Sequence, residues 1–170
     1  TYACEIMTDY FGEGLNGLLS ARSASVRGII NGINYDTWNP AADEFVPNRY
    51  DARNFVSAKK ENKLDLQKEL GLEQNDGKFL VGMVTRLTGQ KGLDLIECVM
   101  DNIFERGDIQ MVILGTGESF YENMLRHFEW KYKGTLASVI KFDNGLSHRV
   151  YAACDAFLMP SLFEPCGLSQ

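Results

Sequence analysis

Two cations five positions apart are the strongest candidates for chemistry in this sequence. Arg86 and Lys91 belong to the segment RLTGQKG, which follows an apolar run and precedes a helical pattern. A helix N-terminus presents free N–H groups and the positive end of its dipole, so it favours anions. A guanidinium and an ammonium placed there can hold a diphosphate. The competing interpretation is a pair of solvated surface charges, because most Lys and Arg side chains are exposed.

A second candidate segment is SLFEPCGLSQ, the last ten residues of the sequence. Glu164 follows the end of an apolar run, and its carboxylate is suited to hydrogen bonding with sugar hydroxyls. Gly167, Leu168 and Ser169 are expected to open a helix whose N–H groups face a phosphate. Cys166 is expected to contribute its backbone, because no His–Cys arrangement supports a nucleophilic thiol.

Three weaker signals lie between these segments. The ring of Tyr151 is placed to stack on a base, although a packed core tyrosine fits the same spacing. His148 is expected to cap a helix or to face solvent. The segment GTGES, residues 115–119, resembles neither a GxGxxG fingerprint nor a P-loop, and a tight turn from strand to helix is its simpler interpretation.

The elements that must position these residues alternate along the chain. Apolar runs predict strands at Lys78–Thr85, Ile109–Gly115, Ser138–Phe142 and Ala156–Pro160, with a further strand at Val26–Asn31. Helical patterns occupy Ser57–Leu70, Leu93–Arg106, Ser119–Lys131 and Ser147–Ala153. Strands that are apolar throughout and separated by helices indicate a parallel sheet covered on both faces. The predicted fold class is therefore a doubly wound, Rossmann-like α/β domain, whose ligands bind beyond the carboxyl ends of the strands.

Composition excludes several classes of function. The net charge of -6 over 170 residues argues against nucleic-acid binding, which needs a cationic face. No apolar run approaches the roughly 20 residues that span a bilayer. The four cysteines form no CxxC pair, so we expect free thiols and neither a structural metal nor a disulfide scaffold. We expect a cytoplasmic protein that binds neither nucleic acid nor membrane.

Three blocks of sequence carry a resemblance to a known family: NGINYDTWNP, RLTGQKGLDL and HRVYAACDAFLMPSLFEPCGLSQ. In this order they resemble the bacterial and plant glycogen/starch synthases, glycosyltransferase family 5, and the upstream residues match as well. The resemblance implies a GT-B enzyme with two facing Rossmann-like domains. Such enzymes transfer glucose from a nucleotide-glucose to the non-reducing end of an α-1,4-glucan with retention, and bacterial members use ADP-glucose. It implies no metal and no other cofactor, and a plastid location for a plant member.

The resemblance also implies roles for matching residues. Arg86 and Lys91 would neutralise the donor diphosphate, which suits the electrostatics of a phosphate leaving group. Tyr151 would stack on the adenine, and Glu164 would hold the transferred glucose. The remaining donor contacts would come from Cys166, Gly167, Leu168 and Ser169. The last of these is commonly Thr in the family, and Ser keeps both the hydroxyl and the N–H that meet phosphate.

The resemblance predicts two parts of unequal size. Residues 1–33 would be the tail of the N-terminal domain with the hinge, and residues 34–170 a truncated C-terminal nucleotide-sugar-binding domain. We interpret both ends as cuts in a longer polypeptide, and we expect the chain alone to be inactive. Two alternatives stay open, namely a UDP-glucose-dependent relative and a non-catalytic nucleotide- or glucan-binding module derived from a GT-B enzyme.

Overall fold

The computed structural model describes residues 2–167 of the chain, and its contacts divide it into two compact units. One unit comprises Thr1–Ile33 together with Phe163–Gln170, and the other comprises Asn34–Leu162. The smaller unit contains the short helices α1 (Tyr2–Glu5) and α2 (Asn16–Ala21) and the 3-10 turn η1 (Ser23–Ser25).

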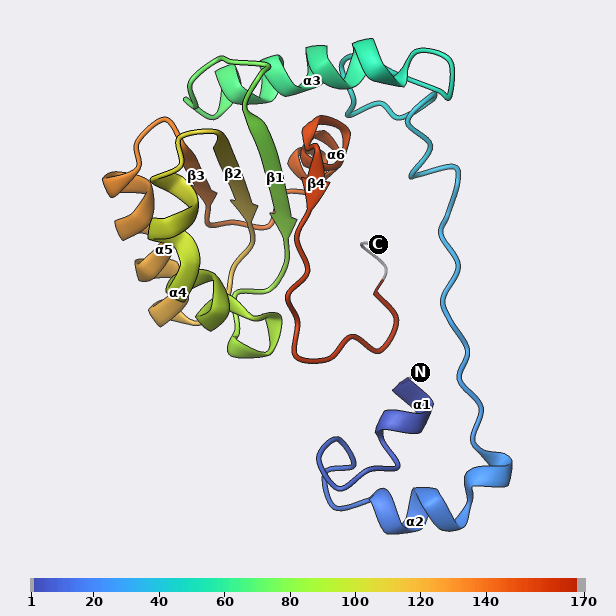
Figure 1. Ribbon diagram of the computed structural model, residues 1–170. Helices are drawn as coiled ribbons and strands as arrows, with labels where there is room; N and C mark the ends of the chain where they lie inside the picture. Colours follow the sequence, from blue (N-terminus) through green and yellow to red (C-terminus); the bar gives the residue numbers. More distant parts are fainter. Residues whose placement is uncertain (1, 168–170) are drawn as a thin grey trace. The chain divides into compact units, whose positions relative to one another are not determined.

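The larger unit is built on a parallel four-stranded sheet in the order β3-β2-β1-β4 (Figure 1). Its strands are β1 (Phe79–Val84), β2 (Ile109–Leu114), β3 (Leu136–Val139) and β4 (Ala156–Phe157). In register, Phe79 pairs with Ile109, Met111 with Leu136, and Val81 with Ala156. The predicted parallel α/β class is confirmed.

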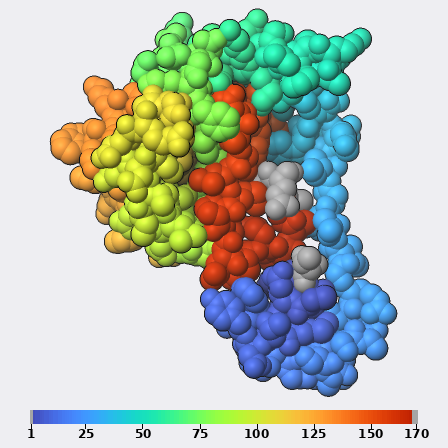
Figure 2. Space-filling view, viewed as in Figure 1, coloured from blue at the N-terminus to red at the C-terminus, as the bar shows by residue number. Residues whose placement is uncertain are grey.

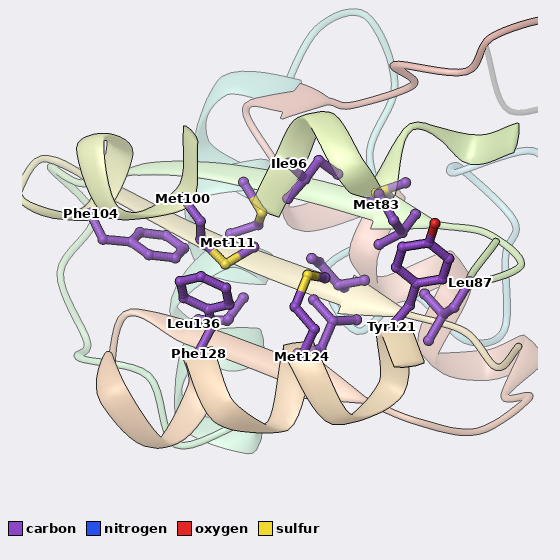
Figure 3. Packing of buried hydrophobic residues seen from close by; sticks show 13 residues of the cluster. Met83, Leu87, Ile96, Met100, Phe104, Met111, Tyr121, Met124, Phe128 and Leu136 are labelled. Carbon is purple, nitrogen blue, oxygen red and sulfur yellow. The ribbon is translucent and has the colours of Figure 1, made fainter. Parts of the chain in front are cut away.

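Helices cover both faces of this sheet. The helices α4 (Leu93–Phe104) and α5 (Ser119–Lys131) pack on one face, where an apolar cluster includes Met83, Met111 and Leu136 (Figure 3). The helices α3 (Phe55–Glu69) and α6 (Asn144–Ala153) pack on the other face, against strand residues such as Leu80 and Val112. Successive strand residues therefore serve opposite faces, as the period of two in a strand requires. In the space-filling view α4 and α5 lie side by side on the surface (Figure 2).

Buried polar side chains hold α3 against the amino ends of the strands. Lys63, whose side chain is 8% exposed, places Nζ 2.6 Å from Oδ2 of Asp155 and also donates to the backbone carbonyl of Lys78. Gln67 and Gln110 are both fully buried, and their side chains hydrogen bond at 2.6 Å. This polar network lies at the edge of the sheet opposite the predicted binding loops, which leaves the carboxyl edge for ligands.

The structure corrects the prediction in four places, one of which is the fourth strand, because it ends at Phe157 and not at Pro160. Residues 26–31 form no strand, and Ile29 and Ile30 are 90% and 81% exposed. The third strand ends at Val139, three residues before the predicted limit. Helix α6 begins at Asn144 and not at Ser147, because the carboxylate of the preceding Asp143 accepts a hydrogen bond from the third N–H of the helix.

Candidate functional site

A pocket of about 250 Å³ opens at the carboxyl edge of the sheet in the larger unit. It is lined by residues 84–86 at the end of β1, 114–116 at the end of β2, 141–143 after β3, and Asn144 and Ser147 of α6. The loops that follow three adjacent parallel strands therefore converge on one cavity, at the position where open α/β sheets bind ligands.

Two cations line this pocket. Arg86 is exposed, and within residues 2–167 its guanidinium has no carboxylate partner. Lys141 was not among the predicted site residues, and its Nζ lies 2.8 Å from Oδ2 of Asp143. That ammonium holds the pKa of the Asp143 carboxyl below its usual range, and the hydrogen bond from Leu146 N–H adds to the effect. The pocket thus contains one guanidinium that is available to an anion and one ammonium shared with a helix cap.

An aromatic ring at the same pocket was also missed by the sequence analysis. Phe142 lines the cavity and is 90% exposed, so its ring has an open face. Tyr151, which was predicted to stack on a base, is half-buried on α6 and does not line this cavity. Its ring packs 4.8 Å from that of Phe157 and 5.6 Å from that of Trp38, measured between centroids.

The loop that carries Lys91 is tightly held. Gly89–Lys91 forms the 3-10 turn η2, and Gly92 follows with φ 75° before α4 begins. A Cβ on Gly92 would lie 2.2 Å from the carbonyl oxygen of Pro160, so only glycine fits there. At the start of the loop Leu87 is fully buried, and its N–H donates to the carbonyl of Thr116 at 2.9 Å. Lys91 lies outside the lining of the pocket, and its role stays a prediction.

The two glycines of the GTGES segment have a packing role. A Cβ on Gly115 would lie 1.8 Å from the carbonyl oxygen of Thr85, and one on Gly117 would lie 2.1 Å from that of Leu87. Their small size therefore allows the loop after β2 to touch the loop after β1. This is the tight strand-to-helix turn that the sequence favoured.

The expectation for His148 was wrong. Its side chain is fully buried, its Nδ1 lies 2.5 Å from Oδ2 of Asp43, and its ring stacks on Trp38 at 3.8 Å. Its Nε2 is buried with no hydrogen-bond partner among the described residues. The cap of α6 is Asp143. His148 instead connects α6 to the segment that contains Trp38 and Asp43.

The remaining predicted site residues lie at the end of the chain. Glu164 and Cys166 are half-buried, Gly167 is buried with φ 70°, and all three belong to the smaller unit. Leu168 and Ser169, with the helix expected to begin at Gly167, lie outside the described residues. The site described above therefore rests on the larger unit, and the roles of these five residues stay predictions.

Residues 2–167 contain no cluster of three or more His, Cys, Asp or Glu side chains that could hold a metal ion. The four cysteines are free thiols. In the same range no helix is both long and apolar enough to cross a membrane.

A pocket at the carboxyl edge of a parallel sheet lies where open α/β folds bind nucleotides and other ligands. The family described as glycosyl transferases group 1 matches residues 67–170, and the chain belongs to it.

Individual relatives carry more specific names than the family does. The chain is 56% identical over 170 residues to a glycogen synthase of Lachnospira eligens and 53% identical to one of Lachnoclostridium phytofermentans. It is 41% identical, with a TM-score of 0.88, to the catalytic domain of starch synthase IV from Arabidopsis thaliana, solved with ADP and acarbose bound. In each comparison all of the chain is covered, and it spans 35% of the relative's length.

Proposed function

We propose that this chain forms the donor-side part of a glycogen (starch) synthase. The reaction is the transfer of glucose from ADP-glucose to the non-reducing end of an α-1,4-glucan, with retention at the anomeric carbon. The observation that carries the proposal is the pocket at the carboxyl edge of the sheet, which combines Arg86 with the exposed ring of Phe142. The similarity to glycogen synthases and to a starch synthase solved with ADP supports the same activity.

The charges at the pocket suit the departure of a nucleoside diphosphate. Negative charge develops on the diphosphate as its bond to the anomeric carbon of glucose breaks. Fixed cations stabilise that charge without reorganisation. Arg86 supplies a guanidinium with no carboxylate partner in residues 2–167. Lys91, on the same loop, is the second cation of the proposal, and Lys141 adds a third at the opposite wall of the pocket.

The base of the donor needs an aromatic face. Phe142 offers an exposed ring at the pocket, whereas the ring of Tyr151 already packs on Phe157. Stacking is tolerant of base identity because every base has a π-face. We therefore assign base stacking to Phe142 in preference to Tyr151. The choice of an adenine nucleotide is supported by the similar starch synthase that was solved with ADP.

The sugar of the donor is assigned to the end of the chain. Glu164 is proposed to hold the transferred glucose. The backbone and hydroxyl contacts to the donor are proposed for Cys166, Gly167, Leu168 and Ser169.

The test is glucose transfer by the full-length protein that contains this chain. Radiolabelled ADP-glucose and UDP-glucose are each supplied with glycogen as acceptor, for the wild type and for Arg86→Ala and Arg106→Ala. Arg106 is a matched control, because it is an exposed guanidinium paired with Asp108 beyond the other end of the sheet. We expect transfer from ADP-glucose, a loss of about 10²–10³ in kcat for Arg86→Ala, and no change for Arg106→Ala.

Each other outcome contradicts a specific part of the proposal. Binding of ADP without any transfer would identify a non-catalytic module. Faster transfer from UDP-glucose would identify a UDP-glucose-dependent relative. Equal activity of the two arginine variants would remove Arg86 from the site.

A further inference from the structure

The first residue of the turn Gly89–Lys91 lies against the hydroxyl of a buried tyrosine. Tyr121 of α5 donates from Oη to Oδ1 of Asp94 on α4, at 2.6 Å. A Cβ on Gly89 would lie 2.9 Å from this hydroxyl and 3.6 Å from Oδ2 of Asp94. Tyr121 lies beside Leu87 at one end of the apolar cluster, with its hydroxyl directed away from the cluster (Figure 3).

The position of the Tyr121 ring is fixed, and its hydroxyl is always the donor in the hydrogen bond to Asp94. Tyr121 is only 7% exposed, so packing fixes its ring. The hydrogen bond to Asp94, together with burial, raises the pKa of Tyr121 to about 12. The phenol therefore keeps its proton at neutral pH and donates to the carboxylate. Asp94 lies in the first turn of α4, where a negative charge is stabilised by the helix dipole.

We propose that Tyr121 and Asp94 are positioning residues for the loop of residues 86–92. Their hydrogen bond holds the Tyr121 hydroxyl against Gly89 and so fixes the position of the turn Gly89–Lys91. The cations of the loop are thereby oriented toward the donor diphosphate. The inference rests on the proposed function, because it assigns the loop to the donor. Neither side chain is required to touch the substrate.

A purely structural role is the competing explanation, and the chain supplies its control. Tyr132, which follows α5, donates from Oη to Oδ1 of Asp101 on α4 at 2.7 Å. This hydrogen bond has the same chemistry and ties the same two helices, but it lies at their other end, away from residues 86–92. If Tyr121 only ties α5 to α4, the loss of its hydroxyl, like the loss of the Tyr132 hydroxyl, will leave the exchange of residues 86–92 and kcat unchanged.

The experiment compares Tyr121→Phe with Tyr132→Phe in the full-length protein. Both changes keep the ring and remove one hydroxyl. We measure kcat and the donor KM for ADP-glucose, and the amide hydrogen exchange of residues 86–92 without ligand. Small displacements of positioning groups have large effects on rate, so we expect Tyr121→Phe to lower kcat about tenfold. Exchange in the loop should rise by a similar factor. Tyr132→Phe should leave kcat within about twofold of the wild type and the exchange unchanged.

Failure of this inference is distinguishable from failure of the proposed function. If the wild type transfers glucose but both variants have the same kcat and the same loop exchange, Tyr121 only ties the helices and the inference is overturned. If the wild type transfers no glucose, the proposed function fails. The exchange data then still decide whether Tyr121 holds the loop, and unchanged exchange in Tyr121→Phe would overturn the inference there too.

A second variant tests the contact itself. Gly89 does not have positive φ, so an alanine is acceptable to the backbone and its methyl group meets mainly the Tyr121 hydroxyl. We expect Gly89→Ala to lower kcat less in the Tyr121→Phe background than in the wild type, because neighbouring residues couple non-additively. Equal effects in the two backgrounds would show that the hydroxyl does not support the turn.

Discussion

The identity of the stacking ring gives the sharpest prediction of a single residue's role. Replacing Phe142 with alanine should weaken ADP binding, whereas replacing Tyr151 with leucine should lower the free energy of unfolding. The reason is burial, since Phe142 is 90% exposed at the pocket and Tyr151 is half-buried against Phe157 and Trp38. The two variants therefore separate a ring that is free to meet a ligand from one that is already packed.

The surroundings of the two rings determine the expected changes in the free energies of ADP binding and of unfolding. Loss of a base-stacking ring costs about 1–3 kcal/mol, which corresponds to a roughly 5- to 150-fold weaker Kd. Removal of the exposed Phe142 ring should change the free energy of unfolding by less than about 0.5 kcal/mol. Tyr151→Leu keeps most of the apolar volume but loses two aromatic contacts, worth about 0.5–1.5 kcal/mol each.

The assay is an ADP titration by calorimetry at fixed ionic strength, with urea unfolding of the same samples. We expect Phe142→Ala to bind ADP at least about fivefold more weakly with an unchanged urea midpoint. Tyr151→Leu should bind ADP within about twofold of the wild type and unfold at lower urea. The reverse pattern, with Phe142→Ala neutral and Tyr151→Leu defective in ADP binding, would refute the assignment and restore Tyr151 as the stacking ring.

Three further predictions follow from the larger unit. His148→Ala should lower the free energy of unfolding by about 1–3 kcal/mol in urea titrations, because the buried carboxylate of Asp43 loses its contact with His148 and keeps the hydrogen bond from Phe45 N–H. Gly92→Ala should destabilise by more than about 1 kcal/mol and slow glucose transfer, since its φ is 75° and its Cβ would meet a carbonyl oxygen at 2.2 Å. Because Lys141 lowers the pKa of Asp143, that pair stabilises the fold above the usual aspartate pKa of about 3.9. The difference in Tm between the wild type and Lys141→Ala should therefore be constant near neutral pH and disappear as the pH falls below that value.

The histidine and glycine predictions each have a control in the same chain. His127 is an exposed histidine, and His127→Ala should leave the urea midpoint unchanged. Gly107 also has positive φ, but no atom lies within 4 Å of its Cβ position, so Gly107→Ala isolates the cost of φ alone. An equal loss in both members of either pair would contradict the packing explanation. A Tm difference for Lys141→Ala that does not shrink as the pH falls below the usual aspartate pKa would contradict the ion-pair explanation.

The sequence was informative where local pattern and tertiary environment agree. The predicted helix Ser119–Lys131 has the limits of α5, because its apolar positions recur with helical spacing along the face that joins the core. The strand β1 is one residue shorter than predicted at each end, and β2 is one residue shorter at its carboxyl end. The prediction was close because helices bury both strands on each side. Residues 26–31 were misassigned because a short apolar run forms a strand only when another strand pairs with it.

The same reasoning explains what was missed at the candidate site. Arg86 was found because the loop after an apolar strand is where such sheets bind ligands. Phe142 was counted as the last residue of a predicted strand, and no site role was predicted for its ring. The strand ends at Val139, and the residues after it form an exposed loop at the pocket. His148 was misplaced because its partner Asp43 is 105 positions away in the sequence, which no local pattern reveals.

The central claim is that Arg86 holds the diphosphate of a nucleotide at the carboxyl edge of the sheet. The most direct test is an ADP titration of the full-length wild type, Arg86→Ala and Arg106→Ala under identical salt. We predict that Arg86→Ala weakens the Kd for ADP by about tenfold or more, about 1.4 kcal/mol or above, and that Arg106→Ala leaves it unchanged. An ADP affinity that is the same in all three proteins, or absent from the wild type, would contradict the account.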